Sequence, residues 1–261
     1  MGNVGKSMNK KKVVVLSELD HDIAMITMCD EENKNIFTEQ FLTELVEAFQ
    51  TVNESEHYKV VILTGFGNYF MSGAPKEKLL SMHDREIKFT DDGNEGKIAI
   101  YSLAMQCKIP VIAAMQGHAI GGGFTFAMYC DVVVMARESV YAPNFMRYGF
   151  TPGFGSTYII PKKVGIALAS EMMLTANYYK GIDLEKRGIP FGVYPRNMVL
   201  DKAIEIARDM AEKTRISLIL LKHQLVKKML EEVEVTVEEE LKMHDITITS
   251  NDAEQLINER Y

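Results

Sequence analysis

Two glycine-containing segments carry the residues best suited to chemistry. One is 70–74, Phe-Met-Ser-Gly-Ala, and the other is 116–124, Gln-Gly-His-Ala-Ile-Gly-Gly-Gly-Phe. The second opens into a predicted helix over 123–131, and the first amides of a helix have no partner within it. One such N–H group from each segment, converging on a single carbonyl oxygen, would form an oxyanion hole. The sequence therefore predicts a site that stabilises an enolate.

Each segment follows an apolar run that is typical of a buried strand. These runs are 58–64 and 110–115. Further strands are predicted over 13–19, 23–28 and 131–136. Helices are predicted over 38–53, with Thr38 as the N-cap, and over 98–107 and 163–175. Strands that alternate with helices in this way favour an α/β fold built from βαβ units.

The chain divides into three predicted regions. Residues 1–10 are polar and contain glycine, so we expect a disordered lead-in there, followed by a core over 11–214. Residues 215–261 have a helical pattern and are predicted to form a C-terminal helical subdomain. We expect breaks in the C-terminal helices near Thr214 and Val233.

Composition excludes several classes of function. The net charge of -7 argues against affinity for nucleic acids or anionic membranes, because both require a basic surface. Cys29, Cys107 and Cys130 form no CxxC pair, and no apolar run is long enough to span a membrane. No cluster of residues has the spacing of metal ligands. We therefore expect a soluble, cytoplasmic protein without a disulfide framework or a metal.

The two glycine segments and Thr-Pro-Gly-Phe-Gly-Ser-Thr at 151–157 resemble the crotonase (enoyl-CoA hydratase/isomerase) superfamily. The resemblance covers nearly the whole chain. It implies a spiral of ββα units with a C-terminal helical region, assembled as a homotrimer or a dimer of trimers. It also places the two oxyanion-hole amides on Ala74 and Gly122.

Two positions depart from the hydratase pattern. Hydratases of this family place two glutamates around a catalytic water. Alignment through the glycine segments puts the first position on Thr125 and the second near Phe145. Neither side chain can take a proton from water at neutral pH, so general acid–base hydration loses both of its groups. Decarboxylation forms an enolate without a protein base, because the departing carbon dioxide leaves its electrons behind.

Four longer strings resemble one branch of the superfamily, the second enoyl-CoA hydratase-like enzymes of polyketide synthase β-branching cassettes. The strings lie at 88–91, 142–153, 184–191 and 239–244. The resemblance implies decarboxylation of 3-methylglutaconyl, carried on the phosphopantetheine of an acyl carrier protein, to 3-methylcrotonyl. No other cofactor is implied.

In that branch a lysine and a C-terminal histidine serve the site, and here they correspond to Lys88 and His244. Lys88 lies in a polar stretch, 76–95, that we predict to be a mobile surface loop, and Lys78 is the alternative partner for the substrate carboxylate. His244 would donate a proton to the dienolate carbon or accompany Lys88 at the carboxylate. The sequence does not choose between these roles.

Other residues near these motifs have a structural interpretation beside a functional one. His118 adjoins the glycines, but a residue at this position usually supports the loop. Tyr148 could donate a hydrogen bond into the pocket or simply pack. Five lysines could contact an acidic carrier protein or form a solvated helix face; they are Lys162, Lys163, Lys222, Lys227 and Lys228.

Two rival functions remain open at this point. One is dehydration or isomerisation of an enoyl thioester, which would need a carboxylate near Thr125 or Phe145. The other is a non-catalytic crotonase-fold module that binds or scaffolds within a synthase complex. The intact pair of predicted amide donors argues against the second.

Overall fold

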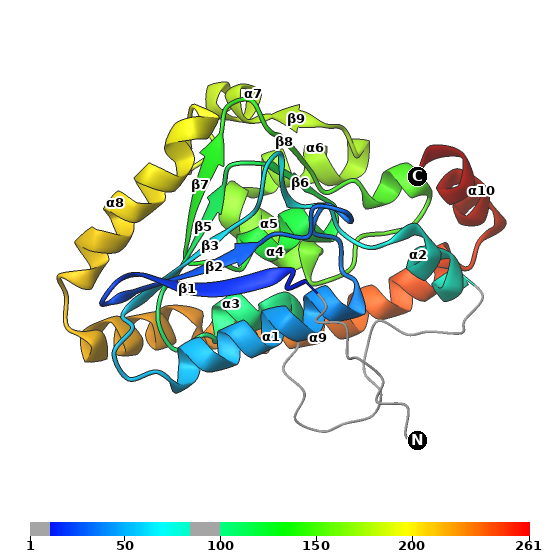
Figure 1. The fold of residues 1–261 in the computed structure, drawn as a ribbon. Coiled ribbons are helices and arrows are strands. Elements are labelled where there is room, and N and C mark those ends of the chain that lie inside the picture. Colours follow the sequence, from blue (N-terminus) through cyan, green and yellow to red (C-terminus); the bar gives the residue numbers. More distant parts are fainter. Residues whose placement is uncertain (1–10, 84–99) are drawn as a thin grey trace, which may run out of the picture.

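The structure is a computed structural model that describes residues 11–83 and 100–261. The predicted lead-in over 1–10 and the candidate Lys88 lie outside the described residues. The described chain combines sheets and helices throughout, which confirms the predicted α/β class (Figure 1).

The larger sheet is mostly parallel, and its central strands are buried. In spatial order its strands are β1 (Val14–Asp20), β2 (Ile23–Met28), β3 (Val60–Thr64), β5 (Val111–Met115), β7 (Val132–Ala136) and β10 (Gly192–Tyr194). β1 and β2 pair antiparallel, and the other neighbours are parallel. β3 and β5 are buried at every residue, because helices cover both faces of the sheet.

A smaller sheet continues the chain from the ends of the larger one. Its strands are β4 (Tyr69–Met71), β6 (His118–Ile120), β8 (Val140–Ala142) and β9 (Tyr179–Lys180). β3 leads within a few residues into β4, and in the same way β5 leads into β6 and β7 into β8. The same unit of two consecutive strands, one in each sheet, therefore occurs three times. This repetition produces the spiral that the crotonase resemblance implies.

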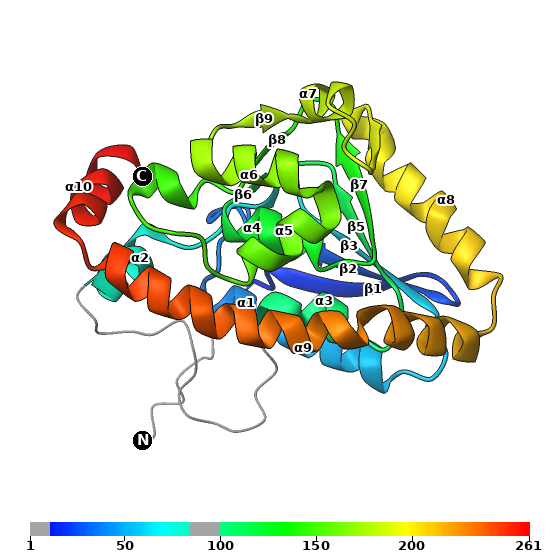
Figure 2. The ribbon, with the colours of Figure 1, turned by 180° about the vertical axis from the view of Figure 1, so that it is seen from behind.

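Helices cover both faces of the larger sheet. They include α1 (Glu39–Glu54), α3 (Leu103–Gln106), α4 (Gly122–Met128), α5 (Ser156–Val164), α6 (Ile166–Thr175), α7 (Gly181–Lys186) and α8 (Val199–Ala211). α8 packs Val199, Ala203 and Ala207 on one face, and α1, α3, α4 and α5 build the larger core on the other. Figures 1 and 2 show α8 along one side of the molecule, away from α1 and α4.

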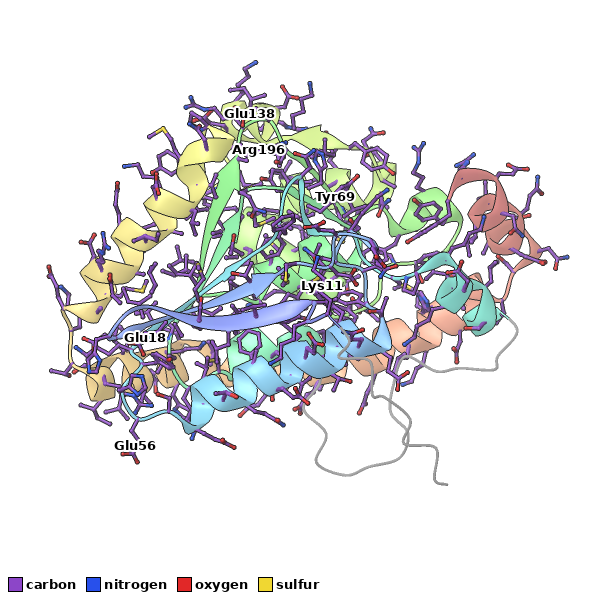
Figure 3. All side chains as sticks on the ribbon, viewed as in Figure 1. Lys11, Glu18, Glu56, Tyr69, Glu138 and Arg196 are labelled. Atoms are coloured by element: carbon purple, nitrogen blue, oxygen red, sulfur yellow. The ribbon has the colours of Figure 1, made fainter. Side chains whose placement is uncertain are left out.

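The remaining helices gather toward one end of the molecule. α9 (Arg215–Ile248) runs along the molecule toward α2 (Lys76–His83) and α10 (Asn251–Arg260), as Figure 2 shows. Short 3-10 turns are η1 (Ile100–Ser102), η2 (Phe145–Tyr148) and η3 (Arg196–Met198). α10 packs against both α2 and η2. At the opposite end from α10, Glu18 and Glu56 project outward (Figure 3).

A close backbone contact brings the two glycine segments together. A methyl group at Gly123 would lie 2.2 Å from the carbonyl oxygen of Met71, so a side chain would push α4 away from β4. Gly121 precedes α4 with φ +56°, a conformation that favours glycine. The ends of β4 and β6 are parallel neighbours, and these glycines let the turns beyond them approach each other.

Three local predictions were wrong. Residues 76–83, which were predicted as loop, form α2. The helix predicted over 163–175 is two helices, α5 and α6, separated by Gly165 at φ +86°. α9 continues through Val233, because burial of Val233 and Val237 on one face outweighs the modest helix penalty of β-branched residues. The N-cap predicted at Thr38 is confirmed, since its side chain accepts from the Phe41 amide.

Two expectations from composition can be compared with the structure. Cys29, Cys107 and Cys130 are free thiols, which agrees with the prediction that they form no disulfide framework. Among the helices of residues 11–83 and 100–261, none is both long enough and apolar enough to cross a membrane.

A buried ion pair fastens the first half of α9 to the core. The Lys222 ammonium lies 2.8 Å from Asp131 Oδ2 and also donates to the carbonyl oxygens of Ala104 and Ile109. Asp131 Oδ2 also accepts from the Val111 amide, at 2.7 Å. Lys222 is therefore unable to contact a carrier protein, contrary to one of the interpretations of the sequence.

Lys163 is also unavailable for the carrier-protein contact that the sequence suggested. Its ammonium donates to the carbonyl oxygen of Cys130 at 2.7 Å, and burial lowers the pKa of its amine. Lys163 and Lys222 both donate to main-chain carbonyl oxygens inside the protein.

We expect Asp131→Ala to lower the free energy of unfolding by about 3 kcal/mol, because it leaves the buried Lys222 ammonium without a counter-charge. Urea denaturation measures the change. The control Glu205→Ala removes the exposed pair with Lys202 and should cost less than about 0.5 kcal/mol. Equal losses in the two variants would show that the buried pair of Lys222 and Asp131 contributes no more to stability than an exposed pair.

Candidate active site

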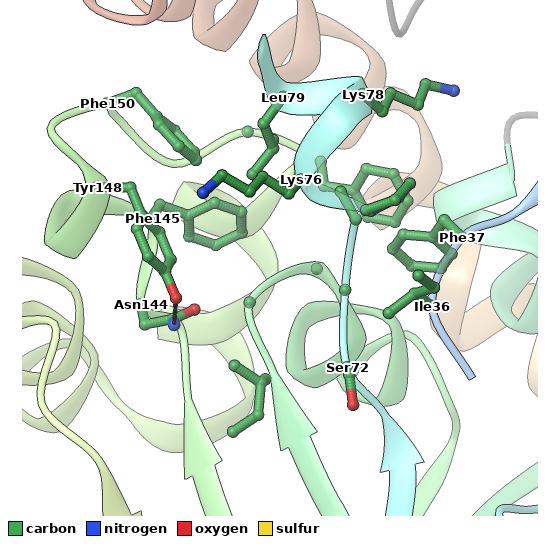
Figure 4. Close-up of a pocket in the computed structure, with 18 of the residues that line it drawn as sticks. Ile36, Phe37, Ser72, Lys76, Lys78, Leu79, Asn144, Phe145, Tyr148 and Phe150 are labelled. Atoms are coloured by element: carbon green, nitrogen blue, oxygen red, sulfur yellow. Dashed lines mark hydrogen bonds between the residues drawn. The ribbon is translucent and has the colours of Figure 1, made fainter. Parts of the chain in front are cut away.

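A cavity of about 1260 Å³ opens where the ends of β4 and β6 face α2, α9 and α10. Its walls combine main-chain atoms of the glycine segments with aromatic side chains of η2 and the turn after it. Figure 4 shows the strand ends below and α2 above. Residues from the ends of β4 and β6, from η2 and from α2, α9 and α10 therefore line one cavity.

The two predicted oxyanion-hole residues lie on this cavity together. Ala74 and Gly122 both line it, with their neighbours Gly73 and Gly121. A methyl group at Gly73 would be 3.6 Å from the Gly122 nitrogen, so the two turns are in contact. Neither the Ala74 nor the Gly122 amide donates a hydrogen bond to another described residue. Both amides remain available for a ligand oxygen, and their role as oxyanion donors stays a prediction.

His244 enters the same cavity from α9. Its Nδ1 lies 2.9 Å from the carbonyl oxygen of Thr151, which can only accept, so Nδ1 carries the proton. Its ring meets the Phe150 ring edge to face, with centroids 5.2 Å apart. The second nitrogen, Nε2, is then the group left for chemistry.

Burial sets the charge of His244 in the free protein. Desolvation lowers the pKa of its imidazole below the ordinary value, while the hydrogen bond to Thr151 and the nearby Asp245 act in the opposite direction. The neutral ring has a lone pair on Nε2, so it can donate there only after it gains a proton. A substrate carboxylate in the cavity would favour that protonation.

Aromatic side chains form one end of the cavity. Phe145, Tyr148 and Phe150 lie there together, with the Tyr148 and Phe150 rings stacked at 6.2 Å (Figure 4). Asn144 Nδ2 lies 3.4 Å from the Tyr148 hydroxyl and 3.2 Å from that of Tyr178. Tyr148 therefore packs against Phe150 and also belongs to a polar cluster with Asn144 and Tyr178 at the cavity wall.

The two positions that correspond to the hydratase glutamates lie in different surroundings. Phe145 lines the cavity and presents an apolar ring there. Thr125 is fully buried, and its hydroxyl lies 2.8 Å from that of Ser156 and 3.3 Å from the Gly121 carbonyl oxygen. Neither position supplies an ionisable group.

A carboxylate that the sequence analysis overlooked does reach the cavity wall. Glu240 is buried, and its Oε2 accepts from the Gly155 amide at 2.6 Å. Its Oε1 accepts from the amide and the hydroxyl of Thr157, at 2.7 and 2.6 Å. Burial raises the pKa of this carboxyl, and those hydrogen bonds oppose the rise. Both oxygens are occupied by the 153–157 turn, so Glu240 positions that turn and is not free to act as a base toward water.

The position of Glu240 was visible in the sequence. Glu240 and His244 are four residues apart in a helical segment, which places them on one face. Thr247 extends that face and bonds the Thr151 amide at 3.1 Å. One face of α9 therefore holds the whole 151–157 turn.

Other carboxylates lie toward solvent. Four exposed glutamates line the outer part of the cavity; they are Glu32, Glu77, Glu234 and Glu238. Their exposure leaves them solvated. They are poorly placed to act as a buried general base.

Two further candidates are placed by the structure. His118 Nδ1 accepts from the Val140 amide at 2.9 Å and so supports the strand pairing beside the glycines. Lys78 belongs to the cavity rim, but its side chain points away from the interior, whereas that of Lys76 points inward (Figure 4).

Comparisons with known proteins agree with this geometry. The profile of the enoyl-CoA hydratase/isomerase family matches residues 18–259. The chain is 47% identical over 249 residues to bacillaene synthase decarboxylase PksI of Bacillus subtilis (strain 168), covering 95% of this chain and 98% of that protein. It is 27% identical over 213 residues to mitochondrial enoyl-CoA hydratase of Pongo abelii, covering 82% and 69%.

Two solved structures are similar over nearly their whole length. One belongs to a dehydratase/decarboxylase enzyme couple involved in polyketide β-branching, with 47% identity, a TM-score of 0.91 and coverage of 95% and 96%. The other is the ECH2 decarboxylase domain of CurF from Lyngbya majuscula, with 39% identity, a TM-score of 0.91 and coverage of 96% and 100%.

We expect Glu240→Gln to lower the free energy of unfolding by about 1–3 kcal/mol, because an amide NH₂ would face a main-chain donor and leave it unsatisfied. Chemical denaturation measures this, with exposed Glu239→Gln as the matched control. If Glu240→Gln proved as stable as the control, the carboxylate would not be what holds the 153–157 turn.

Proposed function

Because this chain belongs to the enoyl-CoA hydratase/isomerase family, we propose that it is a crotonase-fold decarboxylase of polyketide β-branching. The observation that carries the proposal is the 47% identity to a decarboxylase over 95% of the chain. The cavity chemistry is consistent with it. Two main-chain amides that donate to no other described residue line the cavity. The sequence puts Thr125 at one hydratase glutamate position and Phe145 near the other.

The proposed substrate is a 3-methylglutaconyl thioester. Cleavage of the bond to the terminal carboxylate releases carbon dioxide, and its electron pair moves through the double bond onto the thioester oxygen. The resulting dienolate would accept hydrogen bonds from the Ala74 and Gly122 amides. Loss of one such donor typically costs about 3–4 kcal/mol of transition-state stabilisation. Protonation of the dienolate at carbon then gives 3-methylcrotonyl.

His244 and Lys88 would complete the site. In the proposed mechanism the protonated His244 donates from Nε2, either a proton to the dienolate carbon or a hydrogen bond to the carboxylate beside Lys88. Its Nδ1 contact with Thr151 holds the ring in one orientation for both roles. Lys88 is proposed from the sequence resemblance alone, as an ammonium partner of the carboxylate.

The proposed physiological partner is an acyl carrier protein that presents the substrate on phosphopantetheine, with no further cofactor. We propose action in the cytoplasm and assembly as a homotrimer or a dimer of trimers. Exposed apolar side chains on α9 are available for such assembly; they are Ile216, Leu220, Leu221 and Leu225.

Hydration or dehydration of the thioester is the weaker alternative. It needs a carboxylate that can reach a water beside the acyl chain. Glu240 is the buried carboxylate at the described cavity wall, and its oxygens are taken up by Gly155 and Thr157.

Mass spectrometry of 3-methylglutaconyl carrier protein incubated with the enzyme tests the function. We expect the loss of about 44 mass units, one carbon dioxide, as decarboxylation requires. In His244→Ala and Lys88→Ala we expect this loss to slow by about 100-fold, since general acid–base groups contribute factors of this size. A change of about 18 mass units, one water, would contradict the proposal; full activity in either variant would remove that residue from the mechanism.

The pH dependence should report His244. Because burial lowers its pKa and Nε2 donates only when protonated, kcat/KM should fall as the pH rises through a value below the ordinary histidine pKa. The fall in kcat should come at higher pH, since the bound carboxylate favours the imidazolium. Initial rates between about pH 5.5 and 8 measure both profiles. A profile shared unchanged with His244→Gln would show that another group titrates.

A further inference from the structure

Lys76 stands apart from the other cations on the cavity. It is the first residue of α2, and its side chain crosses toward Phe145 and Tyr148 (Figure 4). Leu79, from the next turn of α2, lies beside it in the same wall. The ammonium of Lys76 is thus directed at the aromatic end of the cavity.

The hydrogen bonding of Lys76 leaves capacity for a ligand. Its Nζ donates to the carbonyl oxygen of Asn258, in the last turn of α10, at 3.3 Å. Within the described chain, no carboxylate lies at ion-pair distance from it. An ammonium has three donors, so two remain after the contact with Asn258. This cation is held in place without being neutralised.

The other cations of the cavity wall are directed elsewhere. The Lys34 ammonium lies over the Tyr69 ring, 5.5 Å from its centre. Arg260 donates to the Arg147 carbonyl oxygen at 3.1 Å, and Lys78 points outward (Figure 4). Among the described residues, Lys76 is therefore the lysine or arginine that faces the aromatic end.

We infer that Lys76 is a second cation for the free carboxylate of the acyl substrate, in addition to the Lys88 proposed above, and that it selects thioesters of dicarboxylic acids over neutral ones. The inference rests on the proposed function, because a glutaconyl group carries such a carboxylate. A carboxylate that enters an aromatic, partly desolvated end needs a cation to offset its lost hydration. Lys76 supplies that charge from the wall formed by α2, and His244 faces the cavity from α9.

The role belongs to substrate binding more than to the chemical step. A carboxylate is slower to leave while it is tightly paired, so a strong ion pair at this point would hinder the loss of carbon dioxide. An ammonium shared with the Asn258 carbonyl gives a weaker contact, which recognises the carboxylate and then releases it. Lys76 is thus a specificity-determining residue, and its removal should raise KM more than it lowers kcat.

Binding of two unreactive thioesters tests this inference by calorimetry. Glutaryl-pantetheine carries the carboxylate but lacks the double bond needed to lose carbon dioxide; 3-methylbutyryl-pantetheine is its neutral counterpart. We expect Lys76→Met to bind glutaryl-pantetheine about tenfold more weakly, the size of one charge-assisted hydrogen bond. Its affinity for 3-methylbutyryl-pantetheine should stay within about twofold of wild type. Lys76→Arg should keep most of the glutaryl affinity.

Lys78→Met, on the outward side of α2, separates direct contact from general loss of charge. Unchanged glutaryl binding in Lys76→Met would overturn the inference, as would equal losses for both thioesters or an equal loss in Lys78→Met. Lys76→Gln replaces Lys76→Met if thermal denaturation shows the latter to be unfolded. Should the proposed function fail, no carbon dioxide would be released from the glutaconyl thioester, while the Lys76-dependent preference for glutaryl would persist.

Discussion

The site depends on one close approach between backbones. The helix that starts after β6 lies against β4 at a distance that leaves no room for a side chain at Gly123. The contact places Ala74 and Gly122 on one cavity, although they are far apart in the chain. Main-chain amides cannot be tuned by changing side chains, so the geometry of the two sheets decides where the two proposed donors lie.

The long helix α9 adds the remaining groups and holds them to the same frame. Near its start the buried Lys222 ammonium ties it to the core. Near its end, Glu240 and Thr247 bond the 151–157 turn, and His244 bonds Thr151. The helix therefore sets the tautomer of the histidine and the shape of the facing wall together.

The sequence was informative where main-chain geometry or helical periodicity governs the result. It predicted that the two glycine segments would meet and that Thr38 would cap a helix, because glycine runs and cap residues act locally. The assignment of the amide donors to Ala74 and Gly122 came from the family resemblance. The sequence failed at α2 and around Val233, where packing against distant elements overrides propensity. The burial of Lys222 and the inward direction of Lys76 depend on tertiary contacts that no local pattern records.

The hydroxyl pair formed by Thr125 and Ser156 bears on how such a fold changes its chemistry. The two oxygens lie 2.8 Å apart in a fully buried site, where one hydroxyl donates to the other. A carboxylate placed there would lose its hydration and displace Ser156 without gaining a counter-charge. A glutamate introduced at Thr125 alone would therefore not create a working general base, because the surrounding residues would also have to change.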